Sequence, residues 1–485
     1  MTIILDNNTY KYETEATVKL FIPAVRFEFL YDEHDAEGDV IITRMKKCSR
    51  YVYFYAYIRE NGRVMRSACR TETGKFDVKD GEFTMCRLLF LLLCRFYGIK
   101  PKWGLLTGIR PVKKVNLMLK EGLNESGIRK EFTEKFFVSE EKTDIAWRTA
   151  MVQKPLIGDF ERKTVSIYVS VPFCPTRCSY CSFVSHSMDS AYKLIPEYLD
   201  YLCRELEILG EIVDTYGLKI DTVYYGGGTP TSITADQLHK IMKKTAECFD
   251  LSKIREYNVE AGRADTITEE KLAVIKEMGA TRISVNPQTL NNEVLKTIGR
   301  KGTAEEVLEA FAAARKLGFD NINMDLIAGL PTDSFESFKN TLDRIIGLDP
   351  DGITVHALTL KRSAGLYQDG RENIKNPASM MVDYAIDELI KHGYDPYYMY
   401  RQKNTIDGLE NIGYAKSGKG SLYNIYIMDE TQTILGAGCA ASTKLVDENN
   451  YISRVMNYKF PYEYIRRFDE LMKKKDEIRE FFRDH

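Results

Sequence analysis

The chain has 485 residues, enough for two or three domains, and its apolar and charged fractions are those of an ordinary soluble globular protein. Its net charge is −2 and its pI is about 6.4, so no global basic field predicts a nucleic-acid partner. The opening residues MTIILDNNTYKYETE lack a basic start followed by a long apolar block. We therefore expect a cytoplasmic protein whose ten cysteines stay reduced.

Residues 1–160 are expected to form an N-terminal α+β accessory region that contacts a substrate or a partner and has no catalytic motif of its own. The alternating segments 17–22 and 51–58 predict strands. The apolar segment 85–99 is too short and too charged to span a bilayer, so it predicts a core helix. Seven scattered cysteines are expected to be small buried hydrophobes: Cys48, Cys69, Cys86, Cys94, Cys203, Cys248 and Cys439.

From Val165 onward, β-rich segments alternate with helical patterns. The β-rich segments are 165–171, 221–227, 256–262, 281–287, 321–329 and 352–358, and the helical ones are 195–213, 234–249, 268–278, 305–317 and 334–346. Repeated strand–helix units predict a parallel sheet with right-handed crossovers. We expect a partial (β/α)6 barrel over residues 161–393, with an open doubly wound sheet as the alternative.

Residues 394–485 are expected to form a C-terminal α+β cap. The aromatic and β-branched segments 397–400, 422–428 and 432–435 predict strands. The final segment RRFDELMKKKDEIREFFRDH mixes charges of both signs and predicts one long helix with a solvated face.

Three cysteines lie close together in the segment SVPFCPTRCSYCSFVSH, directly after the first barrel strand. Cys174, Cys178 and Cys181 have the spacing C-x3-C-x2-C, which indicates a metal site. A structural zinc ion would need a fourth ligand, which His186 could supply. The alternative is a 4Fe–4S cluster with three cysteine ligands, whose fourth iron is open to a small molecule.

Polar or glycine-rich residues follow the other predicted strands. The second strand leads into GGGTPT at residues 226–231, the third ends at Glu260, the fourth ends near Gln288 and the fifth ends at Asp325. GGGTPT lacks the Gly-Lys-Ser/Thr ending of a phosphate-binding Walker A loop. Because the carboxyl ends of parallel barrel strands meet at one mouth, we expect these residues and the cysteines to share one site.

The C-x3-C-x-aromatic-C pattern, with Tyr180 as the aromatic residue, resembles that of the radical S-adenosylmethionine (SAM) superfamily. The segments IYVSVPFC, YYGGGTPT, VEAGR, SVNPQTL, TIGR and NMDLIAGLP follow in the order seen in the oxygen-independent coproporphyrinogen III oxidase group and its heme-chaperone cousins. YYMYRQKN, LENIGYAK and the N-terminal extension resemble the coproporphyrinogen dehydrogenase (HemZ) branch. The resemblance covers residues 168–444 closely and the first region more loosely.

The resemblance implies two cofactors, a 4Fe–4S cluster held by Cys174, Cys178 and Cys181, and SAM bound at the open iron. No catalytic residue is expected beyond these cofactors and the residues that hold them. The implied SAM contacts are Tyr168, Tyr180, Gly227, Gly228, Thr229, Glu260, Gln288, Arg300, Asp325 and Thr359. In this set Glu260 would accept a hydrogen bond from the ribose or the ammonium group, and Arg300 would pair with the carboxylate. By residue type alone, Tyr168 is equally a core strand tyrosine.

The implied activity is that of an oxidoreductase in porphyrin and heme biosynthesis. A 5′-deoxyadenosyl radical takes a hydrogen atom from a propionate of coproporphyrinogen III, and loss of carbon dioxide and one electron leaves a vinyl group. A flavodoxin- or ferredoxin-type protein would supply electrons. The alternative is a heme chaperone-like protein that binds and delivers heme.

The chain departs from both subgroups. Phe183 stands where the oxidases carry a fourth cysteine, Ser170 replaces a histidine common in the family, and the HNxxYW-like signature of the chaperones is absent. Propionates are anions, so the site should supply cations. The candidates are Lys361, Arg362, Arg401 and Lys403.

Overall fold

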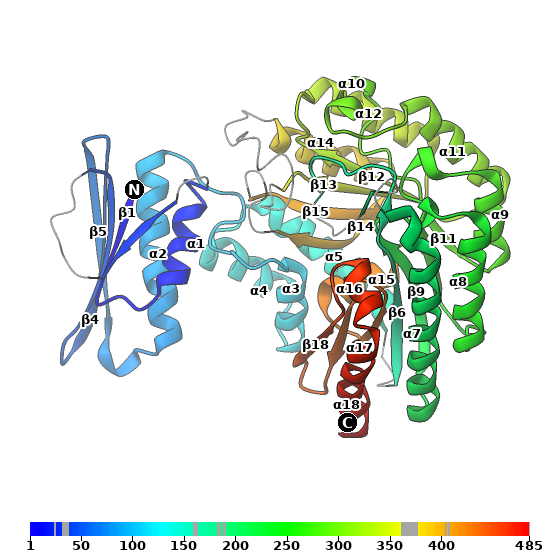
Figure 1. The fold of residues 1–485 in the computed structure, drawn as a ribbon. Coiled ribbons are helices and arrows are strands. Elements are labelled where there is room, and N and C mark those ends of the chain that lie inside the picture. The colour runs from blue at the N-terminus through cyan, green and yellow to red at the C-terminus, as the bar shows by residue number, and fades with distance from the viewer. Residues whose placement is uncertain are drawn as a thin grey trace. The chain divides into compact units, whose positions relative to one another are not determined.

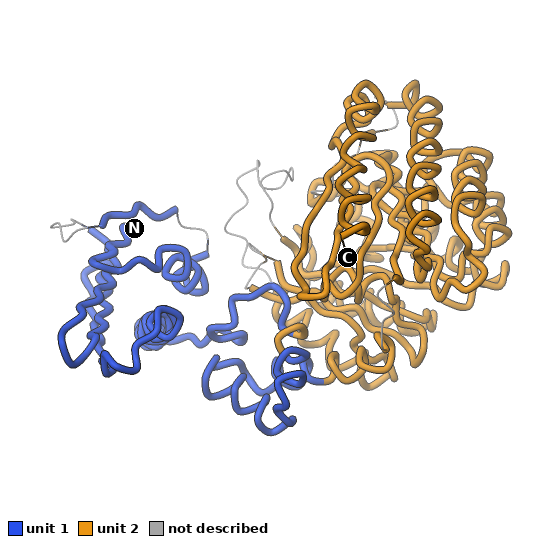
Figure 2. Tube along the Cα trace, turned by 90° about the horizontal axis from the view of Figure 1, so that it is seen from below, with its two compact units in different colours: residues 1–111, 115–147 blue, residues 112–114, 148–485 orange. Residues whose placement is uncertain are grey.

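The computed structural model describes residues 1–23, 26–31, 38–158, 163–181, 186–187, 191–359, 377–402, 405 and 408–484. The chain divides into two compact units, residues 1–111 with 115–147 (unit 1) and residues 112–114 with 148–485 (unit 2), coloured separately in Figure 2. The domain boundaries expected at 160 and 393 stay predictions. Within the described residues, every helix is too short or too polar to cross a membrane.

Unit 1 contains a five-stranded sheet in the order β2-β1-β3-β4-β5. The strands are β1 (Thr2–Asp6), β2 (Glu28–Leu30), β3 (Val40–Lys47), β4 (Tyr51–Glu60) and β5 (Arg63–Glu72). Strand β1 is parallel to both of its neighbours, and β3, β4 and β5 form an antiparallel meander. Helices α1 (Lys11–Lys19) and α2 (Val78–Tyr97) cover one face of the sheet (Figure 1).

The core of unit 1 confirms two of the predicted elements and corrects one. Segment 51–58 is a strand, and alternate residues Val52, Phe54, Ala56 and Ile58 are buried with α2 in one apolar cluster. The apolar segment 85–99 falls in the core helix α2, as predicted. The strand predicted at 17–22 is wrong, because helix α1 buries Thr14, Thr17 and Val18, which share a helical face at spacings of three and four residues.

The short helix η1 (Thr73–Lys75) precedes α2. Four helical segments follow α2: α3 (Pro111–Lys120), α4 (Glu125–Lys130), η2 (Glu131–Lys135) and α5 (Glu140–Ile157). The N-cap of α4 is Asn124, whose side chain accepts a hydrogen bond from the N–H of Gly127 at 2.9 Å.

Unit 2 is built around six parallel strands that lie side by side in chain order: β6 (Thr164–Val171), β9 (Lys219–Gly227), β10 (Glu256–Glu260), β11 (Arg282–Ser284), β12 (Ile322–Ala328) and β13 (Gly352–Ala357). All six were predicted. A doubly wound sheet reverses its strand order at a switch point, whereas these strands never do. The order is that of a partial (β/α)6 barrel.

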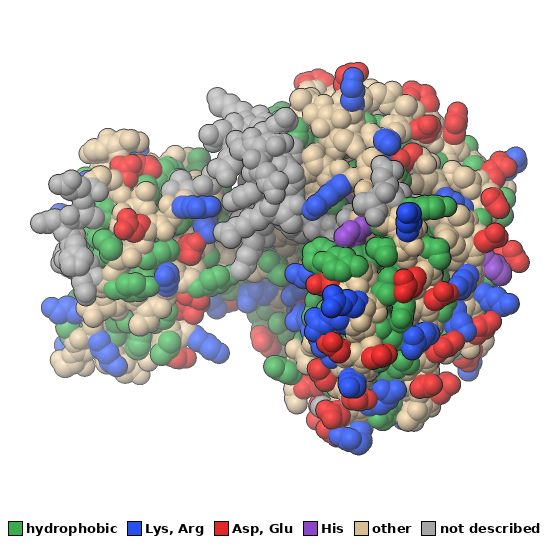
Figure 3. Space-filling model, in the orientation of Figure 1, with side chains coloured by type: hydrophobic (Ala, Val, Ile, Leu, Met, Phe, Trp, Pro, Cys, Tyr) green, Lys and Arg blue, Asp and Glu red, His purple; other side chains and the backbone are tan. Residues whose placement is uncertain are grey.

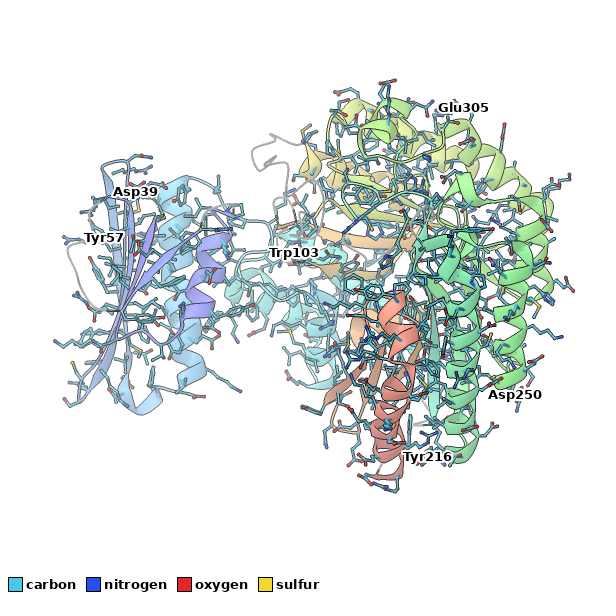
Figure 4. The ribbon with its side chains drawn as sticks, in the orientation of Figure 1. Asp39, Tyr57, Trp103, Tyr216, Asp250 and Glu305 are labelled. Carbon is cyan, nitrogen blue, oxygen red and sulfur yellow. The ribbon has the colours of Figure 1, made fainter. Side chains whose placement is uncertain are left out.

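The helices of unit 2 run on the outside of these strands (Figure 1). They are α7 (Ile195–Tyr216), α8 (Ala235–Cys248), α9 (Glu269–Glu277), α10 (Asn292–Thr297), α11 (Ala304–Lys316), α12 (Phe335–Leu348) and α14 (Ala378–Lys391), with short pieces β7 (Phe173–Cys174), β8 (His186–Ser187), η3 (Tyr192–Leu194), η4 (Pro230–Ser232) and η5 (Ala264–Thr266). In Figure 4, Tyr216 and Asp250 mark the lower ends of α7 and α8, and Glu305 marks the upper start of α11. The carboxyl ends of the strands therefore face the upper edge. Acidic and basic side chains alternate over the face of unit 2 seen in Figure 3.

The C-terminal residues extend the barrel sheet at both of its edges. Strands β14 (Asp395–Arg401) and β15 (Glu410–Ala415) continue from β13, while β16 (Ile434–Ala437), β17 (Ser442–Val446) and β18 (Ile452–Met456) continue from β6. The strands predicted at 397–400 and 432–435 are confirmed in β14 and, in part, in β16.

Two C-terminal predictions are wrong. Segment 422–428 forms the helix α15 (Leu422–Asp429), because Ser421 caps its first turn and a short apolar run does not distinguish a strand from a buried helix. The single long helix is instead three helices, α16 (Pro461–Arg466), α17 (Phe468–Lys474) and α18 (Asp476–Asp484). The last break falls at Lys475, whose ammonium group forms a fully buried ion pair with Glu205 of α7, 2.6 Å apart.

The scattered cysteines also need a correction. Cys86, Cys203 and Cys439 are buried as predicted, whereas Cys48 and Cys69 are exposed. Cys48 lies in the turn between β3 and β4, and Cys69 lies opposite Phe54 on the edge strand β5, at the margin of the helix-covered face. The remaining two, Cys94 and Cys248, are half-buried.

Candidate active site

The cysteine loop begins at the carboxyl end of β6. Cys174 lies in the short strand β7, which pairs in parallel with β8 through Phe173 and His186. Cys178 is buried, Cys174 and Cys181 are half-buried, and the N–H of Cys181 donates to the carbonyl oxygen of Cys178 at 3.1 Å. The structure therefore places the three predicted ligands on one tight turn at the mouth of the barrel.

The glycine segment after β9 packs directly against this loop. The N–H of Gly228 donates to Val171 and that of Thr229 donates to Phe173, both at 2.8 Å. A Cβ atom on Gly228 would lie 2.6 Å from the carbonyl oxygen of Phe173 and 3.0 Å from Sγ of Cys174. Gly227 has a φ of +109°, which favours glycine. Both glycines therefore allow two loops to approach more closely than any side chain would permit.

Arg263 is a buried cation beside the cysteines that the sequence did not single out. Its guanidinium donates to both oxygens of Asp265, at 2.9 and 2.7 Å, and to the carbonyl and hydroxyl oxygens of Thr176, both at 3.0 Å. Nη1 also lies 3.9 Å from Sγ of Cys178. The guanidinium therefore places a positive charge and an N–H donor beside Sγ of Cys178, which would offset the negative charge of a metal-bound thiolate. Its position three residues after the end of the barrel strand β10 was the available signal.

Three cysteines on one loop suit a 4Fe–4S cluster, whose fourth iron would stay open. Within the described residues, which include the three cysteines and His186, no group of three or more His, Cys, Asp or Glu side chains could hold one metal ion. A 4Fe–4S cluster binds each cysteine through a different iron, so its ligands stand farther apart than those of one ion. The ring of His186 instead packs edge-on against Phe460, with ring centres 5.8 Å apart.

A stack of three tyrosines fills the barrel beneath the mouth. Tyr224 and Tyr423 are nearly parallel with ring centres 4.3 Å apart, and Tyr168 stacks on both at 6.2 Å. The phenol of Tyr224 donates a hydrogen bond to Glu260. Tyr168 thus lies in the barrel interior beside the predicted cofactor residues, and Tyr423 reaches it from α15, an element expected to be a strand.

The surroundings of Glu260 and Asp325 shift the pKa values of these two carboxyl groups in opposite directions. The pKa of Glu260 is raised to about 7. Burial is the largest cause and the negative charge of Asp325 adds to it, whereas the hydrogen bond from the Tyr224 phenol lowers this pKa. Burial also raises the pKa of Asp325, but His356 and Asn323 outweigh it and keep that pKa below its ordinary value. Asn323 donates to Asp325 at 2.7 Å, and Nε2 of His356 lies 3.9 Å from the carboxylate.

Gln288 and Arg300 connect neighbouring strand ends. Gln288 has a φ of +66°, and its N–H donates to the carbonyl oxygen of Asp325 at 2.8 Å. Arg300 donates to the carbonyl oxygens of Gly262, at 2.5 Å, and Asn286, and to the phenol of Tyr180 at 3.3 Å. These contacts join the cysteine loop to the loops that follow β10 and β11. The predicted pairing of Arg300 with the SAM carboxylate stays a prediction.

The remaining predicted residues lie near the sixth strand. The hydroxyl groups of Thr359 and Thr405 are 3.1 Å apart. Arg401 is 8% exposed and donates through Nε and Nη2 to the carbonyl oxygen of Gly408, at 3.2 and 3.0 Å. Burial lowers the pKa of Arg401 to about 10. Phe183, Lys361, Arg362 and Lys403 lie outside the described residues.

The site as a whole is a cysteine loop, a close-packed glycine segment and a row of polar residues at the mouth of a six-stranded parallel barrel. These features define a protein that holds an iron–sulfur cluster at an open barrel mouth, with polar groups placed for a second small cofactor.

Comparisons with known proteins agree with this class. The model of the radical SAM superfamily matches residues 168–345. The oxygen-independent coproporphyrinogen-III oxidase-like protein HemZ of Bacillus subtilis is 40% identical over 408 residues, which cover 82% of this chain and 81% of HemZ. The heme chaperone HemW of the same organism is 30% identical over 310 residues, covering 61% of this chain and 77% of HemW. The solved structure of coproporphyrinogen III oxidase (HemN) from Escherichia coli matches with a TM-score of 0.52 at 24% identity, covering 67% of this chain and 73% of that one, which supports the fold alone.

The chain belongs to the radical SAM superfamily, within the family of HemZ-like coproporphyrinogen-III oxidase-like proteins. Its cofactors are accordingly a 4Fe–4S cluster and SAM, as predicted. The roles of individual residues toward SAM stay predictions.

Proposed function

We propose that this protein is an oxygen-independent coproporphyrinogen III oxidase of the HemZ type, which converts propionate side chains of coproporphyrinogen III to vinyl groups. The observation that carries the proposal is the 40% identity with HemZ over 82% of this chain, far beyond the 168–345 segment that the superfamily model matches. Similarity confined to the cluster and SAM region would not distinguish substrates, because that region serves many reactions.

When bound, the cluster and SAM supply a 5′-deoxyadenosyl radical that takes a hydrogen atom from the substrate. We assign Cys174, Cys178 and Cys181 to three irons, and Arg263 to the stabilisation of the Cys178 thiolate. We assign Glu260 to a ribose hydroxyl or the ammonium group of SAM, and Asp325 to its ribose or adenosine. The tyrosine stack of Tyr168, Tyr224 and Tyr423 lines the barrel with apolar ring faces, which limits the water available to quench a radical.

The second candidate is a heme-delivering protein, because HemW, a heme chaperone by name, is 30% identical over 61% of this chain. Both candidates would bind a tetrapyrrole that carries propionates. The two candidate functions differ in whether the propionates are converted to vinyl groups. A turnover assay therefore distinguishes them, whereas a measurement of tetrapyrrole affinity does not.

An anoxic turnover assay tests the proposal. The cluster is reconstituted, SAM, a strong reductant and coproporphyrinogen III are added, and the products are read by mass spectrometry. Loss of carboxyl groups in step with 5′-deoxyadenosine formation is expected. Deoxyadenosine without any change in the tetrapyrrole, together with tight heme binding, would contradict the oxidase and favour delivery. A Cys178→Ser variant should form neither product and serves as the control for cluster dependence.

A further inference from the structure

The solvent face of the unit 1 sheet carries a row of tyrosines. Residues 52, 54, 56 and 58 of β4 point toward the helices, so Tyr51, Tyr53, Tyr55 and Tyr57 point to the opposite side. Figure 4 shows Tyr57 on the side of the sheet away from α2. We call these four residues, with the outward residues of β3 and β5 beside them, the tyrosine face.

The rings of the tyrosine face are accessible to different degrees. Tyr53 is 41% exposed, and the other three are half-buried. The guanidinium of Arg70 lies 4.5 Å from the ring centre of Tyr51, and that of Arg44 lies 6.0 Å from the ring centre of Tyr55. Cations and aromatic rings therefore alternate on this surface, an arrangement that stabilises the sheet and also presents flat π-surfaces to solvent.

Cations flank the row on both sides. Lys46 of β3 and Arg70 of β5 both lie opposite Tyr53 in the register of the sheet, and Arg66 of β5 lies opposite Tyr57. Within the described part of the chain, Lys46, Arg66 and Arg70 have no carboxylate at ion-pair distance. Residues 40–72 contain eight Arg or Lys against two Glu, although the net charge of the whole chain is −2. Of these, Lys47 and Arg63 lie on the helix side of the sheet, and Glu72 lies opposite Tyr51 on the tyrosine face. The expectation of no nucleic-acid partner rested on that average, which hides this local excess.

The dimensions of the tyrosine face suit an extended ligand. Six residues of strand separate Tyr51 from Tyr57, a span of about 20 Å at the usual rise per residue. The cations on β3 and β5 are two strand spacings apart, about 10 Å, with the rings between them. A single tetrapyrrole would cover only part of this row. A protein partner usually meets aromatic anchors clustered at the centre of an interface inside a polar rim, which is a different pattern.

We propose that the tyrosine face binds single-stranded nucleic acid, with unpaired bases stacked on Tyr53, Tyr55 and Tyr57 and phosphates held by Lys46, Arg66 and Arg70. A row of rings in a basic strip is how sequence-tolerant single-strand binders work, because every base has a π-face. Four-stranded sheets of RNA-binding domains use outward aromatic residues in the same way. This inference is independent of the proposed reaction in unit 2.

Fluorescence anisotropy of a labelled 12-nucleotide oligouridine with the full-length protein tests the proposal. Binding should weaken with salt, with a slope of about −2 in log K against log salt for three phosphate contacts. Tyr53→Ala should weaken binding about 5- to 150-fold, the usual effect of losing one stacked base, while Tyr53→Phe should retain it. The double variant Arg66→Gln, Arg70→Gln should weaken binding and make the salt slope shallower.

Matched controls come from the same unit. Tyr12 on α1 is 59% exposed, and Lys79 on α2 is exposed, so Tyr12→Ala and Lys79→Gln should bind like the wild type. SAM cleavage should be unchanged in all of these variants. The proposal fails if the oligonucleotide does not bind at low salt, or if binding survives both Tyr53→Ala and the double arginine variant. It also fails if a duplex or polyglutamate binds equally well, or if coproporphyrin III displaces the oligonucleotide stoichiometrically.

Discussion

The ionisation of Glu260 should control how tightly the protein binds SAM. Its carboxyl group lies inside the barrel, where burial raises its pKa to about 7. Only the ionised form carries a negative charge and accepts through both oxygens, and these charge-assisted hydrogen bonds to the hydroxyl or ammonium groups of SAM are the stronger ones. With that pKa, about one tenth of the molecules are ionised at pH 6 and about nine tenths at pH 8. We therefore expect the affinity for SAM to rise about tenfold between pH 6 and pH 8.

Equilibrium dialysis of labelled SAM against the reconstituted protein at several pH values measures this dependence. Glu260→Gln should remove the part of the pH dependence that belongs to the protein, and what remains belongs to SAM itself. Tyr224→Phe deletes the phenol that lowers the pKa of Glu260, so the midpoint should move to higher pH. The reasoning is refuted if the wild-type affinity is flat from pH 6 to 8, or if Glu260→Gln keeps the full change.

Three further outcomes are expected. Gly228→Ala should lose most of its bound iron, measured by iron and acid-labile sulfide analysis, because a Cβ there would lie 2.6 Å from a backbone oxygen of the cysteine loop; Gly347→Ala, whose Cβ meets nothing within 4 Å, should keep its iron. Lys475→Met should lower the free energy of unfolding by about 3–5 kcal/mol in denaturant titrations, because it leaves a buried carboxylate unpaired; the exposed neighbour variant Lys473→Met should change it little, and equal effects would contradict this reasoning. Arg401→Ala should weaken coproporphyrinogen binding in a titration, and an unchanged affinity would remove Arg401 from the propionate contacts.

Local patterns in the sequence determined much of the barrel. The six parallel strands and the five predicted helices between them are confirmed, because hydrophobic periodicity depends on neighbouring residues only. The spacing of Cys174, Cys178 and Cys181 indicated the cluster for the same reason, since three ligands on one short turn need no distant part of the chain. The resemblance to the radical SAM superfamily rested on such short segments and is confirmed.

Tertiary structure decided what depends on distant contacts. The apolar segment 422–428 suits either a strand or a buried helix. Its burial between the barrel and β14 selects the helix. The approach of Arg263 to Cys178 joins residues 85 positions apart, which no local pattern encodes. Lys475, at the break between α17 and α18, pairs with Glu205 of α7, a partner that lies 270 positions earlier in the chain. The alternating pattern of residues 51–58 predicts a strand with one tyrosine-bearing face. Only the packing of α1 and α2 on the opposite, apolar face of the sheet leaves Tyr53 and its cationic neighbours exposed to solvent.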